Sequence, residues 1–230
     1  MSSFILKIIA CLSMLIDHLG YVIFSTSSYF NCIGRFAFPI FAFQLTEGYA
    51  HTKNLKKYFI RLLIFATLSQ IPFMLFSSIF SSEITINIIF VLVLGLLFMT
   101  IYDRYNKFLG ILSGIIFAIL AQKFNFDYGW YGLAIIMIFH IFKTHTILMS
   151  ISFVIATLAK YIVPIIDFGL INILYVFSTI NLYSLLCIST CMALIFILSY
   201  NGKKGRDSKY FLYVFYPVHL IILYLLNFII

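Results

Sequence analysis

The chain of 230 residues is 63% hydrophobic and only 10% charged, with a mean hydropathy of +1.11 and a net charge of +8. A soluble domain is about one quarter charged, and this chain cannot bury so much apolar surface in a water-soluble core. Composition therefore predicts an all-α, polytopic integral membrane bundle, with a single membrane domain spanning residues 1–230. Nucleic-acid binding is excluded, because the basic residues concentrate in short links between apolar runs.

In chain order, the apolar runs predict about nine membrane segments, some of them kinked. Their ranges are 4–24, 32–50, 58–76, 84–102, 108–122, 129–142, 146–164, 182–200 and 210–229. The first run has no small-residue cleavage pattern, so it is interpreted as a retained span and not as a signal peptide. Residues 168–180 are too apolar for a loop, and they form either a re-entrant piece or a tenth span.

The lysines and arginines predict the orientation of these segments. With the N-terminus in the cytoplasm, twelve of the fifteen basic residues lie on the cytoplasmic side. The twelve are Lys7, Lys53, Lys56, Lys57, Arg61, Arg104, Lys107, Lys143, Lys203, Lys204, Arg206 and Lys209. A tenth span would break this agreement, which favours the re-entrant interpretation of 168–180. The prediction is a multi-pass protein of the cytoplasmic membrane with its C-terminus outside.

Four ionisable residues fall inside predicted segments: Asp17, His18, Arg35 and His219. Such residues are costly in a membrane and usually face protein or water. At 1.5 Å per residue, His18 and Arg35 lie roughly 9 Å and 5 Å below the outer boundary, and His219 lies roughly 14 Å from the inner one. These depths predict that all four meet in one cavity in the middle to outer membrane.

Asp17 and His18 are adjacent, so they point about 100° apart around a helix and do not face each other. Either each serves a different neighbour, for example Asp17 pairing with Arg35, or the helix is distorted at Gly20. Pro39 removes a backbone donor and is expected to kink the second segment beside Arg35. The alternative for Asp17 and Arg35 is a plain ion pair that holds helices together, and for His18 a satisfied buried histidine.

Further polar residues lie near the cytoplasmic end of the predicted bundle. Glu47 and His51 are four residues apart on one helix face, where they either line an entrance or form an interfacial pair. Arg61 and the nearby lysines can attract an anionic ligand such as a nucleotide phosphate, although topology alone also explains them. In the last segment, FYPVHL (215–220) places His219 after a proline in an apolar stretch, which packing alone explains poorly.

Other features are interpreted as structural or peripheral. The four cysteines lie in or beside apolar segments without a set of metal-ligand partners, so no metal site is predicted and they are interpreted as packing residues. Residues 127–130 and 167–169 are expected to be links at the outer side, where they either line a substrate mouth or are ordinary interfacial residues.

Several of these stretches resemble one known family. MLIDHLG, GRFAFPIFAFQLTEGYAHT, KKYFIRLLIFATLSQIPF and FYPVHL resemble the TraX family, the F-pilin N-acetylase family of conjugation systems. The resemblance spans the chain but is thin between about 105 and 205. More distantly, the chain is similar to membrane acyltransferases that carry an essential histidine in an early helix. The residues that match the family pattern are Asp17, His18, Gly34, Arg35, Pro39, Glu47, Gly48, His51, Thr52, Arg61, Ser69, Pro72, Tyr216, Pro217 and His219.

The resemblance implies an acetyltransferase that uses cytoplasmic acetyl-CoA and an amine or hydroxyl acceptor on the outer side, either a pilin N-terminus or an envelope glycan or lipid. His18 is then the base or transient acetyl carrier and His219 a second acid/base, while Arg35 holds the oxyanion or a phosphate and Asp17 fixes its neighbours. The candidates for acetyl-CoA binding are Glu47, His51, Arg61 and Tyr216. Two other hypotheses fit the same residues: a proton-coupled transporter and a non-catalytic membrane subunit.

Overall fold

Helices make up the fold in this computed structural model, which describes residues 1–24, 29–169, 173–206 and 211–229. The helices are α1 (Ser3–Phe24), α2 (Tyr29–Gly34), α3 (Ala37–His51), α4 (Leu55–Ser77), α5 (Ile88–Arg104), α6 (Lys107–Lys123), α7 (Gly129–Ile141), α8 (Thr146–Gly169), α9 (Ile173–Leu198) and α10 (Phe211–Leu226). The prediction of an all-α fold is confirmed for these residues. Asparagine side chains cap the starts of α4, α5 and α6, as is usual at helix N-termini.

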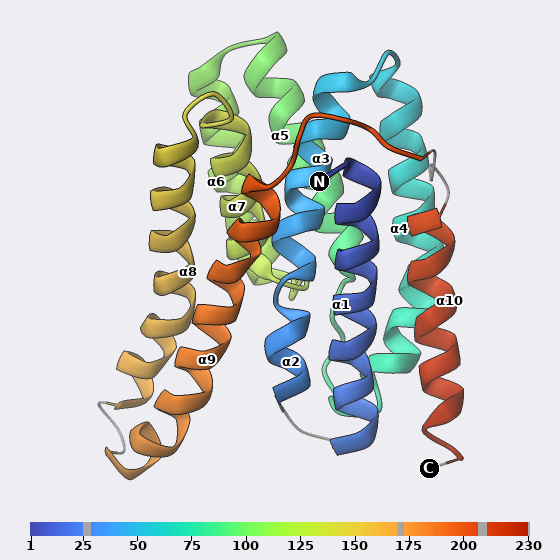
Figure 1. The fold of residues 1–230 in the computed structure, drawn as a ribbon, viewed down its shortest axis with the longest axis vertical. Coiled ribbons are helices and arrows are strands. Elements are labelled where there is room, and N and C mark those ends of the chain that lie inside the picture. The colour runs from blue at the N-terminus through green and yellow to red at the C-terminus, as the bar shows by residue number, and fades with distance from the viewer. Residues whose placement is uncertain (25–28, 170–172, 207–210, 230) are drawn as a thin grey trace.

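The helices run up and down along the long axis of the molecule (Figure 1). Met1 and the links α3–α4, α5–α6, α7–α8 and α9–α10 share one end, which we call the N-terminal end. The end of α10 lies at the opposite end. With α2 and α3 taken together, every predicted segment corresponds to a helix. The basic links predicted to share one side of the protein therefore do share one end of the bundle.

The second predicted segment is broken into α2 and α3 at Arg35 and Phe36. Pro39 stands in the first turn of α3, where it cannot donate a hydrogen bond to the carbonyl of Arg35. The break therefore falls one turn before Pro39, as the sequence predicts. By contrast, α4 and α10 continue through Pro72 and Pro217.

The predictions for 167–180 are wrong in the described residues. Residues 167–169 are the last residues of α8 and not a link, and residues 173–180 are the first turns of α9, not a re-entrant piece or a separate span. No glycine or proline interrupts the sequence between Ile173 and Leu198, so the helix continues into the apolar run that follows. Residues 170–172 lie outside the described part of the chain.

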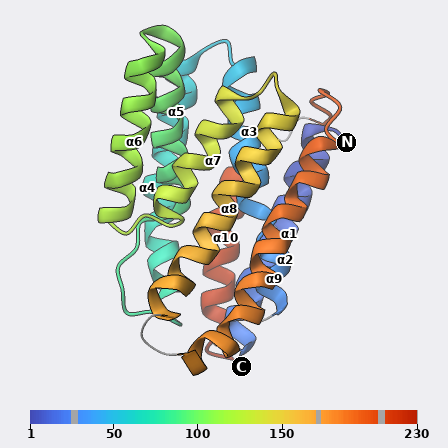
Figure 2. The same ribbon diagram turned by 90° about the vertical axis from the view of Figure 1, so that its left-hand side faces the viewer.

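The link between α4 and α5 folds back into the bundle. The Asn87 side-chain amide donates to the carbonyl of Ala66, at the midpoint of α4, with a donor–acceptor distance of 2.8 Å. Ile86 pairs through its backbone with the α6–α7 link, in an isolated bridge to Phe126. Helices α5 and α7 therefore begin partway along the bundle, and Figure 2 shows α5, α6 and α7 grouped on one side.

Most buried apolar side chains form one large cluster, and a smaller separate cluster lies between α8 and α9. The outward faces of the helices are apolar too. Fully buried side chains include Ile40, Phe98, Phe139 and Phe153. Exposed apolar side chains on the outward faces include Ile64, Leu68 and Ile71 of α4, Ile115 and Ile119 of α6, Ile151 and Ile155 of α8, Ile188 and Ile195 of α9, and Ile222 and Leu225 of α10. Helices α1 and α4 are each long and apolar enough to cross a membrane.

Candidate functional site

Two histidines from opposite ends of the sequence form a direct pair. His18 of α1 and His219 of α10 approach with Nδ1 of the first 2.9 Å from Nε2 of the second. Phe76 of α4 packs against the His18 ring at a centroid distance of 4.8 Å, and His219 is almost entirely buried. The pair therefore joins the first and last helices against α4.

The hydrogen bonds of this pair fix where its protons lie in the neutral form. His219 Nδ1 is 2.8 Å from the carbonyl oxygen of Phe215, and a carbonyl oxygen only accepts, so His219 Nδ1 is the donor. His219 Nε2 then carries a lone pair, and His18 Nδ1 donates to it. Neutral His18 consequently has an unprotonated Nε2, which is the atom a general base or nucleophile needs.

Asp17 and Arg35 form a second pair, which is the first of the two alternatives that the sequence left open. Arg35 Nη2 lies 3.9 Å from Asp17 Oδ1, and the Asn31 side-chain amide donates to the same oxygen at 2.9 Å. The close approach of α2 to α1 depends on Gly34, because a Cβ there would lie 2.2 Å from Asp17 Cβ. The Asp17 side chain therefore contacts α2, while the adjacent His18 side chain contacts α10. This agrees with the angle of about 100° expected between adjacent side chains on a helix.

The α6–α7 link and α8 bring further polar and charged groups near the Asp17–Arg35 pair. Asp127, Tyr128 and Lys160 lie within electrostatic range of the Arg35 guanidinium. The Lys160 ammonium lies 4.8 Å from the centroid of the Tyr128 ring. Arg35 is also in electrostatic range of His18, so these charged groups and the histidine pair belong to one polar region.

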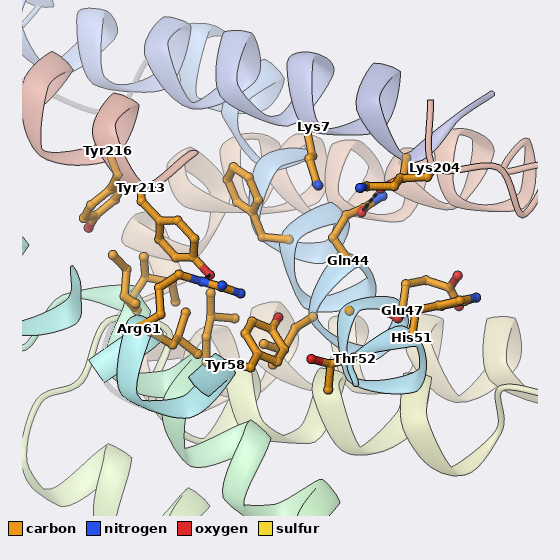
Figure 3. A pocket seen from close by; sticks show the side chains of 18 of the residues that line it. Lys7, Gln44, Glu47, His51, Thr52, Tyr58, Arg61, Lys204, Tyr213 and Tyr216 are labelled. Carbon is orange, nitrogen blue, oxygen red and sulfur yellow. Dashed lines mark hydrogen bonds between the residues drawn. The ribbon is translucent and has the colours of Figure 1, made fainter. Parts of the chain in front are cut away.

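Figure 3 shows a cavity of about 420 Å³ whose lining includes the start of α1 and the end of α3, so it lies on the N-terminal side of this polar region. Its lining residues are Ser3, Lys7, Met14, Phe41, Gln44, Leu45, Glu47, Gly48, His51, Thr52, Tyr58, Arg61, Leu62, Ile88, Ile89, Leu92, Tyr200, Gly202, Lys204, Tyr213 and Tyr216. The sequence predicts that Asp17, His18, Arg35 and His219 lie together in one cavity. None of the four lines this cavity, so the prediction does not hold for it. They form two neighbouring pairs instead, since α1 directs adjacent side chains to different helices.

All four residues predicted to bind acetyl-CoA line this cavity: Glu47, His51, Arg61 and Tyr216. His51 and Glu47 are also joined locally, with His51 Nδ1 2.9 Å from the Glu47 carbonyl oxygen. Burial, together with the Glu47 carboxylate that accepts its hydrogen bond, raises the pKa of Tyr200 to about 12. Of the two interpretations of Glu47 and His51, their place in the lining agrees with an entrance.

Tyr216 connects the cavity with the histidine pair. Its side chain lines the cavity, and its ring centroid lies 5.8 Å from that of His219. On α1, Met14 lines the cavity one helical turn before His18. The cavity therefore ends one turn of helix away from the paired imidazoles.

Sequence reasoning did not find several residues of this region. Asn31, Gln44 and Tyr213 are uncharged residues in apolar helices. Nothing in their spacing along the sequence distinguishes them from packing residues. Lys7 and Lys204 were counted only as topology signals, although both line the cavity. A lysine about one turn inside an apolar helix, as Lys7 is in α1, was the available clue.

Comparison with known proteins gives two matches along nearly the whole chain. A family model described as TraX protein matches residues 2–227. A protein of Dichelobacter nodosus named probable fimbrial assembly protein FimC, serogroup H1, is 29% identical over 238 aligned residues, which cover 96% of this chain and 94% of that protein. No solved structure matches the chain.

Proposed function

Since the chain belongs to the TraX family, we propose that it is a multi-pass membrane acyltransferase that transfers an acetyl group from cytoplasmic acetyl-CoA to an amine or hydroxyl on the outer side. The observation that carries this proposal is the His18–His219 pair, which leaves a basic imidazole nitrogen one helical turn from a cavity lined by cationic and apolar groups. A buried pair of this kind would be an expensive way to hold two helices together if packing were its whole purpose.

Several features support a location in the cytoplasmic membrane with the N-terminus inside. Two helices have the length and composition of membrane spans, and apolar side chains cover the outward faces of most others. The basic links share the N-terminal end of the bundle, which is then the cytoplasmic end. The cavity lies toward this end, where acetyl-CoA is available.

In the proposed reaction, His18 Nε2 takes a proton from the acceptor amine or hydroxyl as it attacks the carbonyl carbon of the acetyl thioester. The imidazolium that forms keeps its Nδ1–H directed at His219 Nε2, which stabilises the charge. The tetrahedral oxyanion collapses, the carbon–sulfur bond breaks, and the thiolate of CoA leaves with the proton from His18. Arg35 supplies positive charge near the oxyanion, and Asp17, which accepts a hydrogen bond from Asn31, holds its position.

The acceptor is proposed to be a pilin N-terminal amine or another envelope amine or hydroxyl. The name of the D. nodosus relative refers to fimbrial assembly, and the TraX resemblance implies pilin acetylation. The acceptor would approach from the end opposite to the cavity, past the region of Arg35, Asp127 and Lys160. Donor and acceptor thus reach His18 from opposite sides.

The test is acetyl transfer by the purified full-length protein in nanodiscs, with radiolabelled acetyl-CoA and either pilin or a membrane extract as acceptor. The expected result is label on the acceptor together with release of free CoA. If neither transfer nor hydrolysis occurs with extract present, the acyltransferase proposal is rejected. Solute uptake by proteoliposomes that follows a proton gradient would then favour the transporter hypothesis.

The role of His219 gives a separate prediction. His219→Gln keeps an oxygen that can accept from His18 Nδ1, whereas His219→Leu removes the acceptor. We expect kcat to fall roughly 10- to 100-fold in His219→Leu, as for other hydrogen-bond partners that orient a functional histidine, and to be largely retained in His219→Gln. Equal losses in two well-folded variants would contradict a positioning role, and steady-state kinetics across pH would show which occurs.

A further inference from the structure

Three cationic side chains from three separate elements line the N-terminal part of the cavity. Lys7 comes from α1, Arg61 from α4 and Lys204 from the α9–α10 link, and Figure 3 shows them around the same space. Among the lining residues in the described part of the chain, only Glu47 is acidic, and it accepts a hydrogen bond from Tyr200. The lining therefore carries a positive excess in a largely apolar enclosure, which favours an anionic ligand.

Arg61 is held in place by tyrosines. Its Nε donates to the Tyr213 hydroxyl at 3.2 Å, and its guanidinium carbon lies 5.4 Å from the ring centroids of both Tyr58 and Tyr213. In the described part of the chain no ion pair involves Arg61. A guanidinium fixed by neutral groups keeps its charge available for a phosphate, which it binds with well-defined geometry.

Gln44 adds an unused hydrogen-bond donor to the same lining. Its side chain is 8% exposed, its Oε1 accepts from the Ser3 hydroxyl at 2.6 Å, and its Nε2 has no partner in the described residues. A buried amide without a partner costs free energy, and a ligand oxygen in the cavity would satisfy it. This observation points to a ligand independently of the charges.

The α9–α10 link is fastened to the start of α1, which fixes the position of Lys204. Ser3 N donates to the Lys203 carbonyl at 2.8 Å, and Phe4 N donates to the Lys204 carbonyl at 3.1 Å. These bonds satisfy backbone donors at the first turn of α1 that have no partner within the helix. Lys204 is therefore positioned by backbone contacts, and its side chain lines the same cavity as that of Lys7.

We propose that Lys7, Arg61, Lys204 and Gln44 form a binding site for the phosphate groups of a phosphate or diphosphate ester. The uncharged part of this ligand extends along Met14, Leu62 and Leu92 toward Tyr216. This inference rests on the proposed function in one respect: if the ligand is the acetyl donor, the phosphates are those of CoA and the pantetheine arm lies in the apolar part. The same chemistry would suit the headgroup of an anionic phospholipid.

The test measures ligand binding by calorimetry to the full-length protein in nanodiscs of zwitterionic lipid. The ligands are inorganic pyrophosphate, acetyl-CoA and acetyl-pantetheine, which lacks phosphates. Lys7→Gln and Lys204→Gln are each expected to raise the Kd for pyrophosphate and acetyl-CoA about tenfold, and to leave the Kd for acetyl-pantetheine unchanged. The matched control is Lys56→Gln, an equal charge change at an exposed position that does not line the cavity.

The outcomes separate this inference from the acyltransferase proposal. Equal weakening by Lys56→Gln, equal loss for acetyl-pantetheine, or no pyrophosphate binding at all would overturn the phosphate site. Pyrophosphate binding that depends on Lys7 and Lys204, without any acetyl-CoA binding, would support the phosphate site and reject the donor. Competition with pyrophosphate by phosphatidylglycerol in the nanodisc would then identify the lipid headgroup as the ligand.

Discussion

His18→Ala is expected to lower the rate of acetyl transfer by about 10²- to 10⁴-fold, the range that a positioned general base contributes. The reason is that Nε2 of His18 is the unprotonated end of the hydrogen-bonded chain that runs from the Phe215 carbonyl through His219. The measurement is single-turnover transfer from radiolabelled acetyl-CoA at saturating donor. A loss confined to kcat, with donor affinity retained, is expected because His18 does not line the cavity.

His145→Ala is the matched control for this substitution. His145 is an exposed histidine just before α8 and lies outside both the cavity and the histidine pair. Its replacement is expected to leave the transfer rate unchanged. If His18→Ala is well folded and turns over acetyl-CoA as fast as His145→Ala does, His18 is not the base, and the pair is a structural contact.

The sequence predicts the helices of this protein well because their apolar runs are long and are separated by polar links. It fails at 167–180, because Asp167 and Gly169, which suggest a link, still belong to the end of α8, and the apolar residues 173–180 belong to the start of α9. It also cannot show that α5 begins partway along the bundle. That depends on Asn87 reaching the middle of α4, a contact between residues 21 positions apart.

Part of the candidate site was predictable for a different reason. Ionisable residues in apolar segments are rare enough to stand out, which identifies Asp17, His18, Arg35 and His219 individually. Their pairing could be inferred only in part. A charge pair such as Asp17–Arg35 follows from opposite sign and similar depth, whereas contact between His18 and His219 requires α1 and α10 to be neighbours across 201 sequence positions.

Gly34→Ala is the second substitution with a large expected effect. The added Cβ would lie 2.2 Å from Asp17 Cβ and 2.3 Å from Asp17 Oδ1, so α2 must move away from α1. This movement weakens the Asn31–Asp17 hydrogen bond and the contact with Arg35. Overpacking of this kind destabilises by about 1–3 kcal/mol, and we expect a lower melting temperature in detergent together with loss of transfer activity.

Gly114→Ala makes the same substitution in α6 and serves as the control. There the nearest atom is the Met137 sulfur at 2.6 Å, near the end of a flexible side chain that can move aside, whereas Asp17 Cβ is fixed to the backbone of α1. We therefore expect a clearly smaller change in melting temperature for Gly114→Ala. If the two variants melt together, or if Gly34→Ala keeps full activity, the close contact of α2 with α1 does not position Arg35. In that case the positive charge proposed for the oxyanion must come from another group, for which Lys160 of the same polar region is a candidate.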